Sequence, residues 1–360
     1  NIGKGIYLEK EARAKYISED TFEKLKCTEI FPGDILVSRL PEPVGRACII
    51  PDKEERMITA VDCTICRPDE TVISKEYLCY FMRSNAYYTR LLGSVTGTTR
   101  KRISRKNLGN VELDVPSREK QNEVVEQLDH LVNVIDSKTR ELQLLDDLIQ
   151  ARFVEMFGDP VQNTKGWNID TCKNLTSKIG SGATPKGGRE SYGTEGISLI
   201  RSMNVYNNRF EYKDLAYITD EQADKLSNVT IEENDVLLNI TGASVARCCA
   251  VPKELIPARV NQHVAIVRCK DRLLPEFLCS MFTEDSYQRL LWSIATSGGA
   301  TREAITKQQI EDLVLIVPPI ELQQQFVDFC KQVNKLKVEI QKSLDETQIL
   351  FDSLMQKYFG

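Results

Sequence analysis

The most regular hydrophobic pattern in the chain lies between residues 117 and 158. Apolar side chains recur there at steps of four and three, with Lys138 filling one gap, at Val124, Leu128, Leu131, Ile135, Leu142, Leu145 and Ile149. One helix cannot bury such a heptad seam in water by itself. Pro116 favours a helix start and Gly158 a helix stop. The pattern predicts a helix over residues 121–156, about 54 Å long at about 1.5 Å per residue, that needs a partner.

A second pattern of this kind closes the chain. Residues 320–360 carry apolar side chains roughly on one helical face, at Phe326, Cys330, Val333, Ile340, Leu344, Phe351 and Tyr358. We expect the two long helices to lie antiparallel against each other, related by a pseudo-twofold axis. The alternative, in which each helix packs on its own globular region, is weaker because a seam of about 36 residues exceeds what a module of about 120 residues can cover.

Shorter patterns precede each long helix. Residues 30–38 predict a turn that leads into a strand, and residues 44–50, 61–66, 111–116 and 197–201 predict further strands. Residues 77–88 are helical in pattern, and Ser104 and Asn107 can cap a short helix. Helices and strands are therefore mixed within each region.

The chain is a duplication. Residues 16–51 align with 217–252 at an offset of 201, and residues 99–128 align with 301–330 at an offset of 202. Eleven of the first 36 pairs and nine of the next 30 are identical, so the chain holds two copies of one module, each closing with a long helix. The predicted fold class is α+β, with two tandem duplicated α/β domains separated by an antiparallel coiled-coil pair. The predicted division is a first domain at 1–117, a helix at 118–158, a second domain at 159–319 and a helix at 320–360.

The second copy has a front part that the first copy lacks. Residues 167–201 have no counterpart, because Asn1 already aligns near Ser202. The repeat predicts that roughly 40 residues of the first module precede Asn1 in a longer parent protein.

Composition sets limits on the class of protein. Of the 360 residues, 41% are hydrophobic and 28% charged, and no apolar run approaches the roughly 18 residues that a membrane span needs. The odd number of cysteines, 11, favours free thiols in a reducing cytoplasm. The net charge of −5 means that any nucleic-acid binding must depend on local basic patches.

Cys63 and Cys66 have the spacing of a metal or redox pair, but no second pair lies nearby in the sequence. At the repeat offset they fall on Val264 and Val267, both apolar. We therefore predict thiols in the core of a strand rather than metal ligands.

The sequence offers little support for catalysis. Neither histidine, His130 or His263, has a triad or metal context in the sequence. The glycine-rich segment 180–188 lacks the spacing of a phosphate-binding loop, and no Asp/Asn-Pro-Pro-aromatic tetrapeptide of amino-methyltransferases is found. We predict no catalytic residue, no metal site and no cofactor site in this chain.

The duplicated motifs resemble those of one known family. They are Gly-Asp-Ile-Leu at 33–36 with Asn-Asp-Val-Leu at 234–237, Asn-Gln-His-Val at 261–264, and Val-Pro at 115–116 with Val-Pro-Pro at 317–319, followed by Glu and Gln. In their order, repeated twice, they resemble the specificity subunit of type I restriction–modification enzymes. The resemblance implies two target-recognition domains that each read half of a bipartite DNA sequence, and helices that set the spacing.

The same resemblance implies partners. It implies double-stranded DNA, two methyltransferase subunits that dock on the helices and bind S-adenosylmethionine, and restriction–motor subunits that can join. It also implies a bacterial or archaeal cytoplasmic protein and no membrane.

Candidate DNA-binding residues follow from charge and from the repeat. The concentrated basic loop predicts phosphate contacts by Arg100, Lys101, Arg102, Arg105 and Lys106, although a basic loop can equally be only solvated. Arg302 repeats Arg100, and Arg247 repeats Arg46 in either a structural or a phosphate-facing role. Base-reading residues should differ between the copies, since the two half-sites normally differ, and the candidates that fit are Arg39, Asn204, Arg209 and Asn239.

Two other classes of function stay open from the sequence alone. The first is an interaction scaffold with two protein-binding heads on a coiled coil, which a gel shift with random duplex would separate from a DNA reader. The second is an enzyme such as a fused methyltransferase fragment, which would have to bind S-adenosylmethionine.

Overall fold

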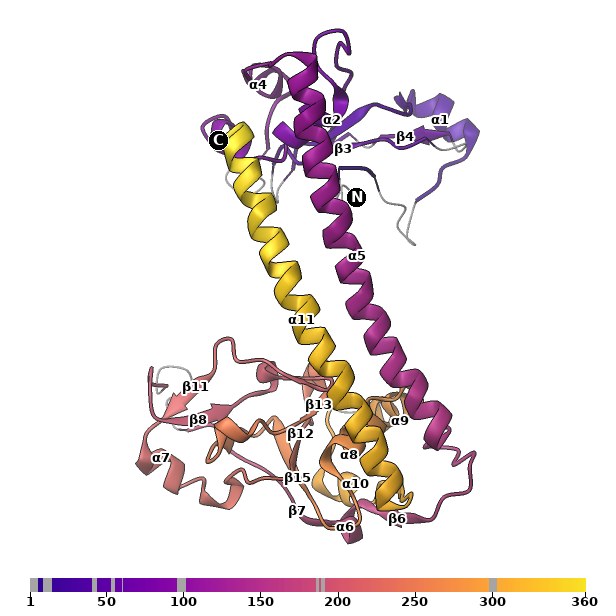
Figure 1. Ribbon diagram of the computed structural model, residues 1–360, viewed down its shortest axis with the longest axis vertical. Coiled ribbons are helices and arrows are strands. Elements are labelled where there is room, and N and C mark those ends of the chain that lie inside the picture. Colours follow the sequence, from indigo (N-terminus) through magenta and orange to yellow (C-terminus); the bar gives the residue numbers. More distant parts are fainter. Residues whose placement is uncertain are drawn as a thin grey trace. The chain divides into compact units, whose positions relative to one another are not determined.

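The computed structural model describes residues 6–8, 15–40, 44–52, 56–59, 61–95, 102–185, 188, 192–297 and 303–360. The chain divides into two compact units (Figure 1): unit 1 comprises Asn1–Glu141 and Glu339–Gly360, and unit 2 comprises Leu142–Val338. Two helices, α5 (Arg118–Phe157) and α11 (Ile320–Phe359), each 40 residues long, contribute to both units. The two predicted long helices are confirmed. The predicted four-part division into domains stays a prediction.

Unit 1 is built on a three-stranded antiparallel sheet in the order β3–β2–β5. Its elements before α5 are α1 (Glu19–Leu25), β1 (Glu29–Ile30), β2 (Ile35–Ser38), β3 (Ala47–Ile49), β4 (Met57–Ile58), β5 (Cys63–Cys66), α2 (Lys75–Phe81), α3 (Asn85–Leu92) and α4 (Arg105–Gly109). Successive side chains of β2 point to opposite faces. Ile35 and Val37 therefore join the main core, while Leu36 joins a smaller cluster on the other face.

Serine caps start the short helices of unit 1. The hydroxyl oxygens of Ser74, Ser84 and Ser104 accept hydrogen bonds from backbone N–H groups at the starts of α2, α3 and α4, which confirms Ser104 as a cap. The helix expected over 77–88 is instead two helices, because a turn at 82–84 and the cap at Ser84 interrupt it.

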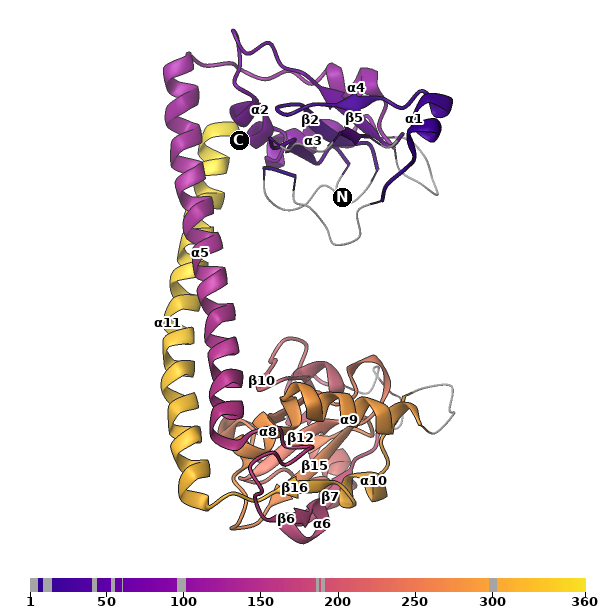
Figure 2. The same ribbon diagram turned by 90° about the vertical axis from the view of Figure 1, so that its right-hand side faces the viewer.

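The ends of both long helices complete the core of unit 1. Val124 and Leu128 of α5 are fully buried there. From α11, Met355 and Phe359 enter the same core, and Tyr358 donates a hydrogen bond to Gln127 at 2.7 Å. The C-terminal turns of α11 thus lie beside the N-terminal half of α5 (Figure 2), so the two helices are antiparallel in this unit.

Unit 2 contains a four-stranded sheet, β13–β12–β15–β7, and a three-stranded sheet, β11–β8–β14. Its strands are β6 (Ile169–Thr171), β7 (Thr176–Ser181), β8 (Ile197–Ile200), β9 (Val205–Tyr206), β10 (Arg209–Phe210), β11 (Ala216–Ile218), β12 (Asp235–Asn239), β13 (Cys248–Ala250), β14 (Arg259–Val260), β15 (Val264–Cys269) and β16 (Val314–Ile316). Along β12, Val236 and Leu238 face one core and Leu237 faces the other, which explains the unbroken apolar run.

Helices cover one face of the four-stranded sheet. The helices of unit 2 before α11 are α6 (Cys172–Leu175), η2 (Ser202–Asn204), α7 (Asp220–Asp224), η3 (Ser227–Val229), η4 (Gly242–Ser244), η5 (Lys253–Leu255), α8 (Pro275–Thr283), α9 (Asp285–Thr296) and α10 (Lys307–Glu311). Phe153 and Phe157 from the end of α5 pack with Phe277 of α8 and Phe326 of α11 in the core on this face. An ion pair between Asp146 and Lys337 joins the two long helices in this unit.

One predicted strand is absent, and the two cysteines of β5 point to opposite faces of the sheet. Residues 111–116 form no strand, whereas the equivalent β16 of unit 2 pairs with β6; the described part of unit 1 holds no counterpart of β6 for this segment to pair with. Cys63 and Cys66 lie on β5 but pack against different clusters, because residues three apart on a strand point to opposite faces. They therefore do not face each other as a ligand pair.

Candidate functional site

The backbone hydrogen bonds at the end of the central strand follow the same pattern in both units. We call this shared pattern, around β12 in unit 2 and β2 in unit 1, the frame. In unit 2, Ile240 donates its N–H to the carbonyl of His263 at 3.0 Å and accepts from the N–H of Ile305 at 2.9 Å. In unit 1, Arg39 donates to the carbonyl of Asp62 at 2.8 Å and accepts from Ile103 at 3.3 Å. These are the positions that the sequence repeat pairs, so the duplication extends to individual hydrogen bonds.

The opposite end of the frame is held by an ion pair in each unit. Asp34 binds Arg67 at 2.7 Å in unit 1, and Asp235 binds Arg268 at 2.7 Å in unit 2. Burial raises the pKa of the Asp34 carboxyl, but hydrogen bonds from Arg67 and from the Phe31 N–H outweigh that effect and leave the pKa lowered. The hydrogen bond that the Arg268 guanidinium donates to the Asp235 carboxylate raises the pKa of Arg268. Both pairs fix the strands rather than offer charge to a ligand.

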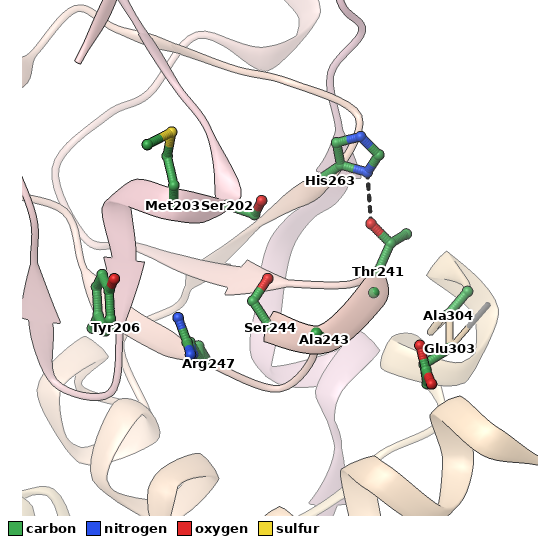
Figure 3. Close-up of a pocket in the computed structure, with 11 residues that line it drawn as sticks. Ser202, Met203, Tyr206, Thr241, Ala243, Ser244, Arg247, His263, Glu303 and Ala304 are labelled. Atoms are coloured by element: carbon green, nitrogen blue, oxygen red, sulfur yellow. Dashed lines mark hydrogen bonds between the residues drawn. The ribbon is translucent and has the colours of Figure 1, made fainter. Parts of the chain in front are cut away.

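A hollow of about 550 Å³ opens beside the frame in unit 2 (Figure 3). Its lining is formed by Ser202, Met203, Tyr206, Thr241, Gly242, Ala243, Ser244, Arg247, His263, Glu303 and Ala304. Hydroxyls, an imidazole, a guanidinium and a carboxylate thus line one concavity. These groups can donate and accept hydrogen bonds with base edges and phosphate oxygens.

Two predicted residues meet at one aromatic ring. The guanidinium carbon of Arg209 lies 4.8 Å from the centre of the Tyr206 ring, and that of Arg247 lies 4.6 Å from it. Cation–π attraction stabilises such an arrangement. Arg209 also pairs with Glu211 at 3.2 Å.

A chain of hydrogen bonds orients the imidazole of His263. The Thr184 hydroxyl donates to the side-chain oxygen Oε1 of Gln262, and the side-chain nitrogen Nε2 of Gln262 lies 3.2 Å from His263 Nε2. An amide nitrogen only donates, so Nε2 accepts and the proton of the neutral ring is on Nδ1. His263 Nδ1 then donates to Thr241 Oγ1, 2.6 Å away, which leaves the Thr241 hydroxyl proton available to a ligand (Figure 3).

The glycine-rich segment noted in the sequence makes this chain possible. A Cβ atom on Gly182 would lie 1.7 Å from the carbonyl oxygen of Val260, so only glycine allows the two backbones to approach. The Gly182 N–H donates to the Asn261 carbonyl at 3.2 Å, which brings Thr184 to Gln262.

The same place in unit 1 carries different side chains. Asp62 replaces His263 at the equivalent position and forms an ion pair with Arg102. Arg39, which replaces Ile240, donates from Nε to the carbonyl of Ile103 at 3.1 Å. The two units therefore present different polar groups from one backbone frame.

Two of the predicted base-reading residues lie in the interior of unit 2. Asn204 and Asn239 are both fully buried. The Asn239 amide donates to the carbonyl of Ser202 at 2.8 Å, and that of Asn204 donates to the carbonyl of Glu211 at 2.9 Å. Both instead fix the β9–β10 hairpin that carries Tyr206 and Arg209.

The remaining predicted residues are placed as follows. Arg105 and Lys106 are exposed on α4, and Arg102 is exposed but paired with Asp62. Arg39 and Arg46 are half-buried. Arg100, Lys101 and Arg302 lie outside the described residues. The sequence prediction did not include Tyr206, Thr241, Ser244 and His263. For Thr241 and Ser244 a signal was available, because they oppose the apolar Leu40 and Pro43 in the repeat alignment.

The fold and this surface define a protein with two related but chemically different heads on paired helices. A family model for the type I restriction modification DNA specificity domain matches residues 2–146 and 165–348. The chain therefore belongs to that family of specificity proteins.

Curated relatives are distant but extensive in coverage. The chain is similar to the putative type I restriction enzyme MjaX specificity subunit of Methanocaldococcus jannaschii, at 21% identity over 356 residues, covering 92% of this chain and 78% of the relative. It is similar to the type I restriction enzyme EcoKI specificity subunit of Escherichia coli at 18% identity over 318 residues, covering 82% of this chain and 67% of the relative.

Solved structures support the fold. A type I restriction–modification S subunit from M. genitalium superposes with a TM-score of 0.56 at 13% identity, covering 92% of this chain and 83% of that one. A chain from a study of the assembly and conformational transition of a type I restriction–modification system superposes with a TM-score of 0.57 at 19% identity. The match covers 92% of this chain and 82% of that one. The α+β class predicted from the sequence, with two β-rich regions and paired long helices, is confirmed.

Family membership also fixes what the chain does not do. Specificity subunits are the non-catalytic members of type I restriction–modification complexes, and S-adenosylmethionine is bound by the methyltransferase subunit. Within the described residues, no helix has the length and apolarity needed to cross a membrane.

Proposed function

We propose that this chain recognises a bipartite DNA target, with each unit reading one half. The observation that carries the proposal is the shared backbone frame with different side chains at matched positions. Unit 1 has Asp62 and Arg102 where unit 2 has His263 and Ala304. Two heads of one design and different surface chemistry suit two different half-sites.

The paired helices act as the spacer between the half-sites in this proposal. A helix of 40 residues extends about 60 Å at 1.5 Å per residue. Half-sites read from one face of DNA lie about 34–36 Å apart for each helical turn. A fixed length of helix therefore corresponds to a fixed number of unread base pairs.

The helices also serve as the dock for two methyltransferase subunits in this proposal, and restriction–motor subunits join through them. Large apolar side chains stay exposed on both helices in unit 2, at Leu144, Leu148, Leu336 and Val338. In unit 1, Ile349 and Leu350 of α11 are at least half exposed. Apolar side chains gathered on a surface favour protein partners.

Sequencing of methylated adenines tests the proposed function. The host carrying the complete gene set should show a bipartite motif, two specified blocks separated by a fixed unspecified spacer. That motif should disappear when this gene is deleted and return with it. A methylome that does not change on deletion would refute DNA reading by this chain and favour the interaction-scaffold alternative.

A further inference from the structure

The side chain of Arg247 is held at the hollow by an aromatic ring and not by an acid. Its guanidinium carbon lies 4.6 Å from the centre of the Tyr206 ring. Among the described residues no carboxylate lies within 4 Å of this guanidinium, whereas Arg209 pairs with Glu211 and Arg268 with Asp235. The N–H donors of Arg247 thus remain available to an anion.

The charges around Tyr206 favour an anionic ligand. One ring holds two guanidiniums, Arg209 at 4.8 Å and Arg247 at 4.6 Å, and of these two Arg209 pairs with Glu211. Ser244, which carries a hydroxyl, lines the same hollow as Arg247 (Figure 3). Arginine with nearby hydroxyls is the set that commonly binds phosphate oxygens.

The repeat decides between a phosphate and a base as the partner of Arg247. The same residue stands at the equivalent position of unit 1, as Arg46, and the frame hydrogen bonds around the two are alike. Ser38 donates its N–H to the carbonyl of Arg46 at 2.8 Å, and Asn239 to that of Arg247 at 2.8 Å. A residue shared by two heads that read different half-sites suits the part of DNA that is the same in every sequence.

Resting on the proposed DNA-reading function, we propose that Arg247 contacts a backbone phosphodiester of the second half-site. Tyr206 is its positioning residue, because the ring holds the guanidinium in place without using its donors. Glu303 lines the hollow on the side of Thr241, where its carbonyl accepts from the Gly242 N–H. Its carboxylate repels an anion at that end and so favours the Arg247 end for the phosphate.

The test uses the chain assembled with the methyltransferase subunits of its host. Two duplexes of equal length serve as probes, one with the motif found by methylome sequencing and one without it. Affinity is measured for both between about 50 and 200 mM salt, the range over which phosphate contacts change binding strongly. The variants are Arg247→Gln, Arg247→Lys, Tyr206→Leu, Tyr206→Phe and the double variant Tyr206→Leu/Arg247→Gln.

Arg272→Gln is the matched charge control. β12 and β15 are antiparallel, so Asn239 pairs with Val264 at the hollow, and Asp235 pairs with Arg268 at the other end. Arg272 follows β15 beyond Arg268 and pairs with Asp170 at 2.9 Å. Its loss removes one charge from the same unit, away from the hollow.

Arg247→Gln should weaken binding to both duplexes by the same factor, about tenfold, and reduce the salt slope by about 0.9, the value for one phosphate. Arg247→Lys should keep the slope. Tyr206→Leu should weaken binding several-fold with the slope unchanged, while Tyr206→Phe should bind like the wild type. The double variant should bind no more weakly than Arg247→Gln alone, since in this proposal Tyr206 contributes to phosphate binding through Arg247 and not through Arg209.

Three outcomes overturn the assignment. An unchanged slope in Arg247→Gln removes Arg247 from the phosphate contacts. A changed ratio between the two duplexes makes it a base-reading residue instead. Additive losses in the double variant would show that Tyr206 acts independently. Failure of the wild-type complex to prefer its motif is a different result, because it refutes the proposed function and not the role of Arg247.

Discussion

The ring of Phe359, the last residue of α11, lies 5.1 Å from the ring of Tyr77 in the core of unit 1. The equivalent residue at the end of α5, Phe157, lies 4.8 Å from Phe277 in the core of unit 2. Each long helix thus begins against one core and contributes its last aromatic ring to the other. Residues far apart in sequence are required to finish each unit.

Phe359→Ala should destabilise unit 1 by about 3–5 kcal/mol, the usual cost of removing a buried phenylalanine ring. Hydrogen exchange followed by mass spectrometry should show lost protection in β2, β3 and α2, with unit 2 unchanged. Phe157→Ala is the matched variant and should reduce hydrogen-exchange protection in unit 2 while leaving unit 1 unchanged. Equal loss of protection in both units for either variant would mean that the units unfold as one.

Gln121→Leu should destabilise unit 1 by about 2–4 kcal/mol, because it leaves buried backbone groups without partners. The fully buried Gln121 accepts from the Ser74 N–H at 2.8 Å and donates to the carbonyls of Val72 and Pro116. Gln323→Leu should destabilise unit 2 in the same way. The Gln323 side chain accepts from the Leu274 N–H and donates to the carbonyls of Arg272 and Pro318.

Thermal unfolding measures both glutamine effects. The control is Gln143→Leu, because Gln143 is exposed on the same helix α5 and should change stability by less than about 0.5 kcal/mol. A loss in the control as large as in Gln121→Leu would point to helix propensity and not to the buried hydrogen bonds.

The pairing of Asp34 with Arg67 should make unit 1 sensitive to acid. The folded-state pKa of Asp34 is lowered from the ordinary 3.8, so its contribution to stability is fully present above that value. It is lost as pH falls below 3.8 through the lowered pKa. Chemical denaturation of the wild type and Asp34→Asn between pH 6 and pH 3 measures this, and the variant should lose less stability over that range. Parallel curves for the two proteins would exclude the carboxylate as the source.

The sequence predicted the main features of the fold because they depend on repeated local patterns. The heptad at Leu128 and Leu131, the alternation around Ile35 and the stop at Gly158, whose φ of +75° suits glycine, are all signals of this kind. The break at Ser84 was missed because an apolar face at helical spacing continues across it. The strand expected at 111–116 failed because a strand also needs a partner, which local pattern does not supply.

The candidate site was predicted less well. Asn239 was a candidate because it differs from Ser38, its counterpart in the repeat, but η2 covers it, and only tertiary structure reveals that cover. Arg247 and Arg209, which lie 38 residues apart in the numbering, were both named from the sequence, yet nothing in it placed them on one ring. Thr241 and His263 became candidates only when the hollow brought them together.

Neutralising the exposed end of the basic loop should weaken DNA binding without changing sequence preference. Arg105→Gln/Lys106→Gln removes two exposed charges of α4, and the salt slope should fall by up to about 1.8 if both contact phosphates. Binding of the assembled complex to motif and non-motif duplexes measures this. Lys24→Gln/Lys26→Gln removes two exposed charges of the same unit as a control. A slope equal to that of the wild type would show that the loop is only solvated.

His263→Ala should relax the DNA sequence preference in one half of the target only. His263 Nδ1 holds Thr241 Oγ1 at 2.6 Å and so directs the Thr241 hydroxyl proton toward a ligand. Without the imidazole this hydroxyl rotates freely, and one position of the half-site read by unit 2 should lose about 1–3 kcal/mol of discrimination. Sequencing of methylated adenines in a host carrying the variant measures the motif directly. His130→Ala replaces the other histidine, which is exposed on α5, and should leave both halves unchanged. Relaxation in both halves, or in the half read by unit 1, would contradict a local reading role for the Thr241–His263 pair.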